Sequence, residues 1–339
     1  MSIYDDRLLW PGTAPPSEGS PDRRPGSVRR TTNVDLVRPE GFTGPLVITG
    51  SGRDLVTQLD GQTISAATAT TEVTLDYVGG RLIQSVTADP EPESLDALVG
   101  TRVGSGFRRI LVELLPGLAA SHSLVHLLLD ELTPATLISG STLAREGSIE
   151  LASAGPMAKM PLDICAGWVT GGAMTAAISE TGIPLLGLGP PAPALERGDD
   201  PSSWHGMAPL PPRSMRRRRL IDLGPATVGV PDLVAQVRFR DSYWEPDGVE
   251  TVVHEYGLTL GVNPDTWLVT VAEAAPGPLP APECPTAAAS ADRLVGLRVD
   301  DLRDLVRVEF TGTSTCTHLN DVFRSLADLA HLWALLPPN

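Results

Sequence analysis

The strongest constraint on the fold is an internal repeat. Residues 95–122 align without gaps on residues 291–318, with identical residues in the same order and a histidine at the end of each copy. Earlier in each half, residues 27–36 are echoed by residues 214–223. Matches that keep their order and nearly their separation are what duplication of one structural unit leaves behind. The sequence therefore predicts two homologous modules in one chain.

The repeat divides the chain into four parts. Residues 1–25 are polar and rich in Pro, Gly and Ser, which predicts a disordered or extended arm. Residues 26–132 form the first module and residues 213–339 the second. Residues 133–212 are too long and too apolar for a plain linker, so we expect a partly packed segment that carries polar motifs.

Each module is predicted to be a small antiparallel sheet followed by helices. In the second module, apolar and polar residues alternate over 233–239 and 251–262, and 267–272 has the composition of a third strand. Helical patterns follow over 287–295 and 302–310. Strands followed by helices favour an α+β class with the helices packed on one face of each sheet.

The first module shows the same pattern less clearly. Residues 72–75 and 82–87 predict strands. A helix is expected to follow, with Ser121 as its N-cap, Leu128 on its buried face and Pro134 at its end.

Charge and composition restrict the partners. A net charge of -15 argues against nucleic acid and anionic membranes, because that affinity depends on cationic side chains neutralising phosphates. The 4% aromatic content leaves few platforms for base stacking, and no apolar stretch is long enough for a transmembrane helix. We predict a cytoplasmic protein that acts on a small molecule; the sequence leaves open whether it is a homo-oligomer. Lys159 is the only lysine among many arginines, which is typical of a GC-rich coding sequence.

The run Cys316-Thr317-His318-Leu319-Asn320-Asp321 begins a helix with an apolar stripe. A helix N-terminus lowers the pKa of a thiol, and Cys316 meets His318 if the cysteine lies at or before the cap. This predicts a catalytic Cys-His pair in which His318 or His254 keeps Cys316 as a thiolate, and a carboxylate such as Asp163 or Asp321 orients the imidazole. Alternatively, Cys284, Cys316 and His318 hold zinc or iron; no other cofactor is expected, because the sequence has no phosphate-binding or dinucleotide-binding glycine motif.

A third set of residues needs no thiol. His254 and Tyr256 are two residues apart in a predicted strand and therefore share one face. Together with Asp241 on the neighbouring strand, they are candidates for general acid and base.

Other residues are candidates for substrate binding. Arg216 and Arg217 lie in the only dense basic run, and a guanidinium suits a carboxylate or phosphate. In the connecting segment, Trp168, Trp204 and His205 stand in glycine-rich or proline-rich surroundings where aromatic and imidazole side chains are uncommon.

Several motifs carry a family resemblance. The runs 239–242, 247–250, 254–256, 283–285, 294–296 and 316–321 resemble the domain of unknown function 2889 family, and the central motifs resemble those of longer actinobacterial members. The resemblance implies a tandem arrangement with one complete and one degenerate copy, since Ala120 stands where Cys316 stands in the second module. It implies no activity, because the family has none assigned. The positions of Cys284, Cys316 and His318 are also similar to the ligand layout of iron-sulfur cluster assembly scaffolds, which implies that fold for the module.

These observations favour a pseudo-dimeric enzyme with its pocket between the two modules. Cofactor-independent acid/base or nucleophilic chemistry, of the hydrolase, lyase or isomerase type, is the leading hypothesis. The alternative is a protein without turnover that holds a metal or a small ligand through Cys284, Cys316 and His318.

Overall fold

The computed structural model describes residues 9–10, 12–145, 162–182, 184–226 and 232–336. Its centre is one eight-stranded antiparallel sheet with the strand order β10-β9-β8-β7-β2-β3-β4-β5. The strands are β2 (Ser27–Val37), β3 (Leu46–Thr57), β4 (Thr63–Asp76), β5 (Leu82–Asp89), β7 (Met215–Pro225), β8 (Leu233–Trp244), β9 (Glu250–Val262) and β10 (Val269–Pro276). A separate short parallel pair joins β1 (Leu9–Trp10) to β6 (Leu186–Gly187).

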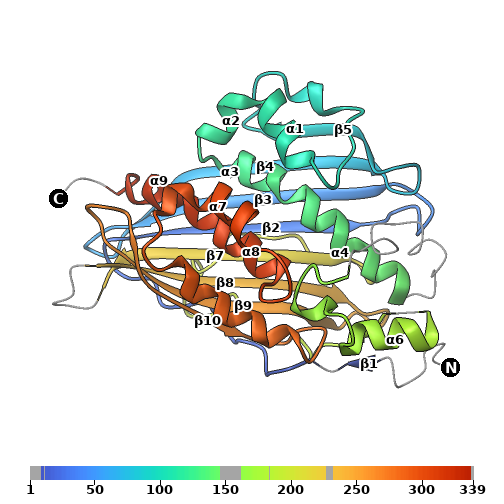
Figure 1. The fold of residues 1–339 in the computed structure, drawn as a ribbon. Helices are drawn as coiled ribbons and strands as arrows, with labels where there is room; N and C mark the ends of the chain where they lie inside the picture. The colour runs from blue at the N-terminus through green and yellow to red at the C-terminus, as the bar shows by residue number, and fades with distance from the viewer. Residues whose placement is uncertain (1–8, 11, 146–161, 183, 227–231, 337–339) are drawn as a thin grey trace.

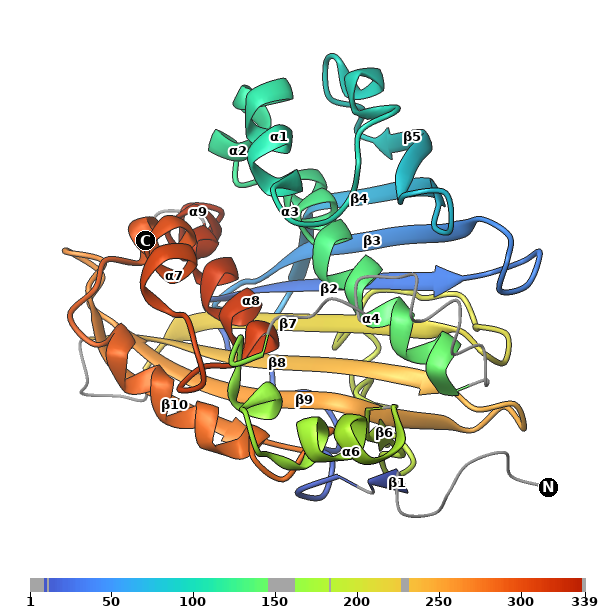
Figure 2. The same cartoon turned by 45° about the vertical axis from the view of Figure 1, so that its right-hand side comes forward.

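The helices of both halves pack on one face of this sheet (Figures 1 and 2). The first half has the 3-10 helix η2 (Leu95–Leu98), then α1 (Phe107–Leu114), α2 (Pro116–Ala120), α3 (Leu124–Asp130) and α4 (Leu132–Arg145). The connecting segment has η4 (Ala166–Trp168) and α6 (Ala173–Thr181). The second half has η5 (Cys284–Leu294), η6 (Val299–Asp301), α7 (Leu302–Glu309), α8 (Thr317–Ser325), η7 (Leu326–Asp328) and α9 (Leu329–Trp333). Within the described ranges, no helix has both the length and the apolar character needed to cross a membrane.

The mixed α/β character and the helix-covered face agree with the sequence-based prediction, but the sheet does not. Two small sheets were expected, one in each module, whereas β2 and β7 pair along their length and make one continuous sheet. On each side of this seam, four strands run in sequence order as a meander. They are followed by 3-10 helix, η2 in the first half and η5 and η6 in the second, and then by α-helices.

Local predictions were corrected at several points. The basic run 216–219 was expected to bind an anion but was not expected to be a strand, and it lies inside β7. The N-cap of α3 is Ser123, whose side chain accepts a hydrogen bond from the His126 amide, and not Ser121. Pro134 does not end a helix; it lies in the first turn of α4, where its missing N–H costs nothing. The C-terminal helix is three short segments, α8, η7 and α9.

Each half has its own hydrophobic core between the sheet and the helices. Leu98 and Val103 are fully buried in the first core, and Leu294 and Val299 are fully buried in the second. The gapless alignment of 95–122 with 291–318 pairs Leu98 with Leu294 and Val103 with Val299.

The opposite face of the sheet is covered by irregular chain. Arg29 of β2 donates hydrogen bonds to the carbonyls of Pro21 and Ser203, and Arg240 of β8 donates to the carbonyls of Ser17 and Pro193. Parts of the N-terminal arm and of the connecting segment are thus fixed to the sheet by buried guanidinium groups.

Two reciprocal ion pairs join β2 and β7 on this opposite face. Arg216 pairs with Asp35 at 2.6 Å, and Arg29 pairs with Asp222 at 2.7 Å. The strand register places the members of each pair directly opposite one another. All four side chains are buried, so each charge depends on its partner across the seam.

Candidate functional site

In the second half, a row of three polar residues crosses the helix face of the sheet. The strand registers place Arg217 of β7 opposite Asp241 of β8, and Asp241 opposite His254 of β9. Side chains directly opposite one another on neighbouring strands point to the same face. The sheet therefore brings a guanidinium, a carboxylate and an imidazole together from three segments of the chain.

A second row lies two residues further along the same strands. Arg219 stands opposite Phe239, and Phe239 stands opposite Tyr256. Because side chains alternate between the faces of a strand, this row also points towards the helices. Phe239 is fully buried, and the guanidinium groups of Arg217 and Arg219 lie 4.8 and 5.9 Å from the centre of its ring.

Helix α8 supplies the last two residues of the site, which lie above these rows. Cys316 is the N-cap of α8 and has extended backbone angles, φ -128° and ψ 130°, so it lies just before the first turn. This is the placement that the sequence required if Cys316 was to meet His318. The Cys316 Sγ lies 3.9 Å from the His318 Nδ1, within reach of a weak thiol hydrogen bond.

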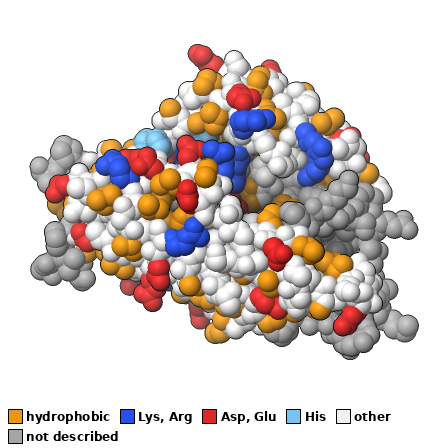
Figure 3. Space-filling model, in the orientation of Figure 1, with side chains coloured by type: hydrophobic (Ala, Val, Ile, Leu, Met, Phe, Trp, Pro, Cys, Tyr) orange, Lys and Arg blue, Asp and Glu red, His pale blue; other side chains and the backbone are white. Residues whose placement is uncertain are grey.

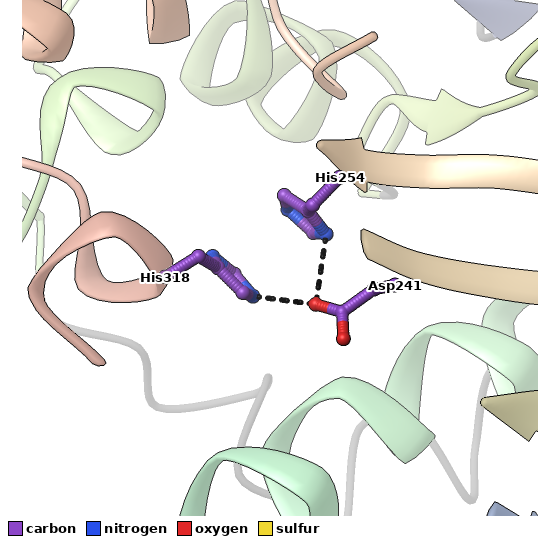
Figure 4. A group of neighbouring side chains, drawn as sticks. All are labelled: Asp241, His254 and His318. Atoms are coloured by element: carbon purple, nitrogen blue, oxygen red, sulfur yellow. Dashed lines mark ion pairs between the residues drawn. The ribbon is translucent and has the colours of Figure 1, made fainter. Parts of the chain in front are cut away.

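The imidazoles of His254 and His318 both turn towards one oxygen of Asp241 (Figure 4). The distances from Asp241 Oδ2 to His254 Nδ1 and to His318 Nε2 are both 3.7 Å. The two imidazole rings stack with their centres 3.7 Å apart. His318 therefore has the Cys316 thiol at one nitrogen and the Asp241 carboxylate beyond the other.

Acidic and basic residues from both halves surround this group. Arg217 donates from Nε to Asp241 at 2.8 Å and from Nη1 to Glu131, at the α3–α4 junction, at 2.9 Å. Arg108 of α1 donates to Asp321 of α8 at 2.8 Å. Side chains of both charges lie next to one another over the middle of the helix face (Figure 3). The site is thus built where the two halves meet.

Both histidines are neutral near pH 7. Burial, together with the neighbouring His318, lowers the pKa of His254 well below its ordinary value. Burial, together with the charge of Arg217, lowers the pKa of His318 to about 3. A neutral imidazole has one N–H and one lone pair, which is the form that can accept a proton from a thiol.

Burial changes the expected state of the thiol. The position of Cys316 at a helix N-terminus predicted a lowered pKa, but burial raises the pKa of Cys316. The N-terminal charge of α8 does not compensate for the loss of water around a side chain that is 5% exposed. Burial and the neighbouring Cys316 likewise hold the pKa of Tyr256 well above its ordinary value, so Tyr256 is a neutral phenol.

The donor atoms that come together are not those of the predicted metal site. Among the described residues, Asp241, His254 and His318 have ligand atoms within 4.8 Å of one another. The stacked rings limit their use: planes tilted by 21° and 3.7 Å apart meet only about 10 Å from the rings, whereas a bound zinc lies in the ring plane roughly 2.1 Å from the nitrogen. An ion shared by both imidazoles requires one ring to rotate.

The remaining cysteines lie in the same core as Cys316 but are not part of the row of polar residues. Cys165 and Cys284 are both buried, and burial raises the pKa of each thiol. The nearby Cys316 raises both pKa values further. Trp168 is 9% exposed in this core and helps to close it. Asp163 lies outside the site, because its carboxylate is exposed and accepts hydrogen bonds from the backbone and side chain of Thr170.

Three predicted substrate-binding residues lie on the opposite face of the sheet. Arg216 belongs to the seam ion pair, while Trp204 and His205 lie in the loop that covers that face. All three line a groove of about 430 Å³ there. Alternation along β7 separates Arg216 from Arg217, so of the two arginines only Arg217 belongs to the site at the helix face.

The hydrogen bonds of His205 explain its place in the loop. Its Nε2 lies 2.7 Å from the Asn33 side-chain oxygen, which also accepts from Ser51 at 2.5 Å, and its Nδ1 lies 2.8 Å from the Thr31 hydroxyl. The Nε2 therefore donates to Asn33, and the Nδ1 accepts from Thr31. With its Nε2 proton directed to Asn33, His205 holds the loop on β2 and does not act as a base for Ser51.

Two residues of the site were not assigned their roles from the sequence. The sequence indicates Asp241 only as a partner of His254, and it also faces His318. Nothing in the local sequence indicates Glu131, which pairs with both Arg217 and Arg219. The repeat contains a signal for Asp241: Arg30 and Asp54 are separated by 24 residues and hydrogen-bonded, as are Arg217 and Asp241.

Comparisons with known proteins place only the second half. No curated protein and no solved structure matches the chain. The family match begins with β7 and ends in α9, so it includes Arg217, Asp241, His254, Cys316 and His318 and covers about a third of the chain. It extends over one domain and does not include the first half. Residues 215–331 match the model of the family described as Protein of unknown function (DUF2889).

Proposed function

We propose that this protein is an enzyme that acts on a small molecule through a relay formed by Cys316, His318 and Asp241. The proposal depends on the position of the His318 ring between the other two residues. The Cys316 Sγ lies 3.9 Å from His318 Nδ1, and the Asp241 Oδ2 lies 3.7 Å from His318 Nε2. A nucleophile, an imidazole and a carboxylate in this order are the parts of an acid/base relay, and such contacts are often long before substrate binds.

Because the Cys316 thiol and the His318 imidazole are both neutral, the first step includes a proton transfer between them. As the Cys316 sulfur attacks an electrophilic carbon of the substrate, its proton moves to the lone pair on His318 Nδ1. The Nε2 proton then lies towards Asp241, whose charge stabilises the imidazolium that forms. The imidazolium returns its proton to the leaving group, so that no external oxidant or cofactor is consumed. Tyr256, a neutral phenol beside Cys316, is placed to donate to a developing negative charge.

We infer that the two halves arose by duplication and that only the second kept the chemistry. The strand registers place Ala67 opposite Asp54, just as His254 lies opposite Asp241. At the neighbouring position of β4, Ala69 stands where β9 has Tyr256.

The helices support the same inference. In the gapless alignment, Ala120 stands in place of Cys316. A bulge follows Asp54 in the first half and Asp241 in the second, which supports the equivalence of the two positions. The first half thus keeps the counterparts of His318 and Asp241, which are His122 and Asp54, but has alanine in place of Cys316, His254 and Tyr256. It also supplies Glu131 and Arg108 to the junction between the halves.

The experiment that tests the function is conversion of small molecules in an extract, followed by mass spectrometry. The wild-type protein is compared with Cys316→Ala, His318→Gln and Asp241→Asn, and with the matched control His122→Gln from the first half. The proposal expects one or more compounds to be consumed by the wild type and by His122→Gln and to be unchanged with the three site variants. Undiminished conversion by Cys316→Ala would exclude the thiol and leave His254 and Tyr256 as the reactive pair.

The second candidate function is holding a metal ion without turnover. It is favoured by one observation: among the described residues, the buried His254 Nδ1 has no hydrogen-bond partner, although it faces Asp241. In this alternative Asp241, His254 and His318 replace the set predicted from the sequence, and rotation of one ring completes the site. Metal content distinguishes this candidate from the relay.

A further inference from the structure

Arg219 has buried donors without partners. The residue is 3% exposed, and its Nη2 donates to Glu131 at 2.7 Å. Its Nε and Nη1 are buried and have no hydrogen-bond partner among the described residues. In the described part of the chain, Arg219 is the arginine with two such nitrogens; the other arginines have one or none. A buried donor left without an acceptor is costly, so two on one guanidinium indicate that an acceptor belongs there.

The positive charge of the Arg219 guanidinium is also only partly neutralised. Glu131 is shared, since one of its oxygens accepts from Arg219 and the other from Arg217. Arg217 has a second carboxylate of its own, Asp241, whereas Arg219 makes no ion pair with a described residue besides the one with Glu131. The guanidinium of Arg219 is therefore the less neutralised of the two.

The unpartnered atoms gather in the candidate site. Arg219 and Tyr256 lie on either side of Phe239 in one row, and the Tyr256 hydroxyl has no nitrogen or oxygen partner, only the Cys316 thiol beside it. His254, which also has a free nitrogen, lies in the adjacent row. The Phe239 ring lies 6.3 Å from the ring of His318.

We propose that the substrate carries an oxyanion, a carboxylate or phosphate group, which accepts hydrogen bonds from Arg219 and Tyr256 while the reacting carbon lies near Cys316. This inference rests on the proposed function in one respect, since it names the substrate class of the same site. The first half has no counterpart of this anion site at the equivalent position, because Thr32 of β2 corresponds to Arg219. The oxyanion completes the hydrogen bonding of Arg219 and adds the negative charge that Glu131 alone does not supply.

The test measures binding of simple anions by calorimetry and by thermal shift at constant, low ionic strength. Acetate and malonate represent the carboxylate source, inorganic phosphate represents the phosphate source, and chloride at equal ionic strength is the reference. The variants are Arg219→Gln and Arg219→Lys. Arg218→Gln is the matched control, because Arg218 is equally buried, lies next in β7 and points to the opposite face, where it pairs with Glu196 and Glu250.

One anion class should bind the wild type with one equivalent. Arg219→Gln should weaken that binding roughly ten- to hundredfold, the usual effect of losing hydrogen bonds to a charged group, and Arg218→Gln should leave it unchanged. Arg219→Lys, which keeps the charge, should bind at an intermediate strength and controls for loss of folding. Equal binding by Arg219→Gln and Arg218→Gln, or no binding of any anion by the wild type, would overturn the inference.

The anion measurement does not use the reactivity of Cys316, so it is read separately from the relay. Absence of anion binding would remove the substrate class and leave the relay standing. Loss of the relay, measured by the reactivity of Cys316, would leave the anion site standing.

Discussion

Replacing Asp328 with asparagine should destabilise the protein strongly, because Asp328 ties the two halves together. The side chain is fully buried in η7. Its carboxylate accepts from Arg30 of β2 at 2.8 Å, from Arg303 of α7 at 2.7 Å and from His122, which precedes α3, at 2.9 Å. Asparagine keeps the size but removes the charge, so the buried Arg30 loses one of its two carboxylate partners and the partly buried Arg303 loses the carboxylate it pairs with.

The expected loss follows from this burial. Breaking a buried ion pair by removing one partner costs about 3–5 kcal/mol. With an unfolding entropy near ~2.1 cal/mol/K per residue, the chain length converts this loss into a fall in Tm of about 4–7 °C. Arg30 retains its bidentate bonds to Asp54, which places the expected value towards the lower end of that range.

Thermal unfolding followed by circular dichroism or calorimetry measures the effect. Asp304→Asn is the matched control, since Asp304 makes only an exposed pair with Arg307 in α7, and exposed substitutions usually change stability by under about 0.5 kcal/mol. Equal Tm values for Asp328→Asn and Asp304→Asn would refute the reasoning that buried charges fasten the halves together.

Three further predictions concern pH, the histidines and metal content. Burial alone would raise the pKa of Asp328, but the hydrogen bond from His122 and the charges of two arginines lower it. The carboxylate therefore contributes its full stability above the pKa of the unfolded chain, and this contribution is lost as the pH falls below about 4. The Tm difference between the wild type and Asp328→Asn should shrink in acid. His122→Ala should destabilise by about 1–2 kcal/mol and keep turnover, whereas Cys316→Ala should keep stability and abolish turnover, as thermal melts and the extract assay will show. Elemental analysis of protein purified without chelator should find well under one equivalent of zinc or iron, because the rings of His254 and His318 are stacked; a full equivalent that disappears in His254→Ala would favour the metal-holding candidate.

Much of the architecture was accessible from the sequence because it depends on local patterns. Alternation of apolar and polar residues located β8 and β9, and the apolar stripe after Cys316 located the buried face of α8 and η7. The convergence of Cys316 and His318 could also be predicted, since it requires only that the cysteine precede the first helical turn.

Other features depend on contacts between distant segments, which a local pattern does not reveal. The pairing of β2 with β7 brings residues about 187 positions apart into register and turns two expected sheets into one. The basic run 216–219 did not resemble a strand, because its arginines are buried only through acids such as Asp35, Glu131 and Asp241 from other segments.

The state of the thiol was predicted wrongly for a related reason. The sequence shows the helix N-terminus at Cys316, which favours a thiolate. Burial has the larger effect on the pKa of Cys316, and it depends on β9 and the connecting segment, which pack in the same core as the thiol. The choice of carboxylate was open for the same reason. Asp163 is near Cys165 in sequence, whereas the strand that carries Asp241 faces His318 only in the folded sheet.

The most direct test of the relay is the rate at which iodoacetamide alkylates each cysteine in the native protein, measured by mass spectrometry. Cys165, Cys284 and Cys316 are similarly buried, at 7%, 7% and 5% exposure, so the first two are internal controls. The relay predicts that Cys316 reacts fastest and that His318→Gln slows Cys316 alone, by roughly a hundredfold as for the loss of a general base. Equal rates for the three thiols, or a Cys316 rate that does not change in His318→Gln, would contradict it.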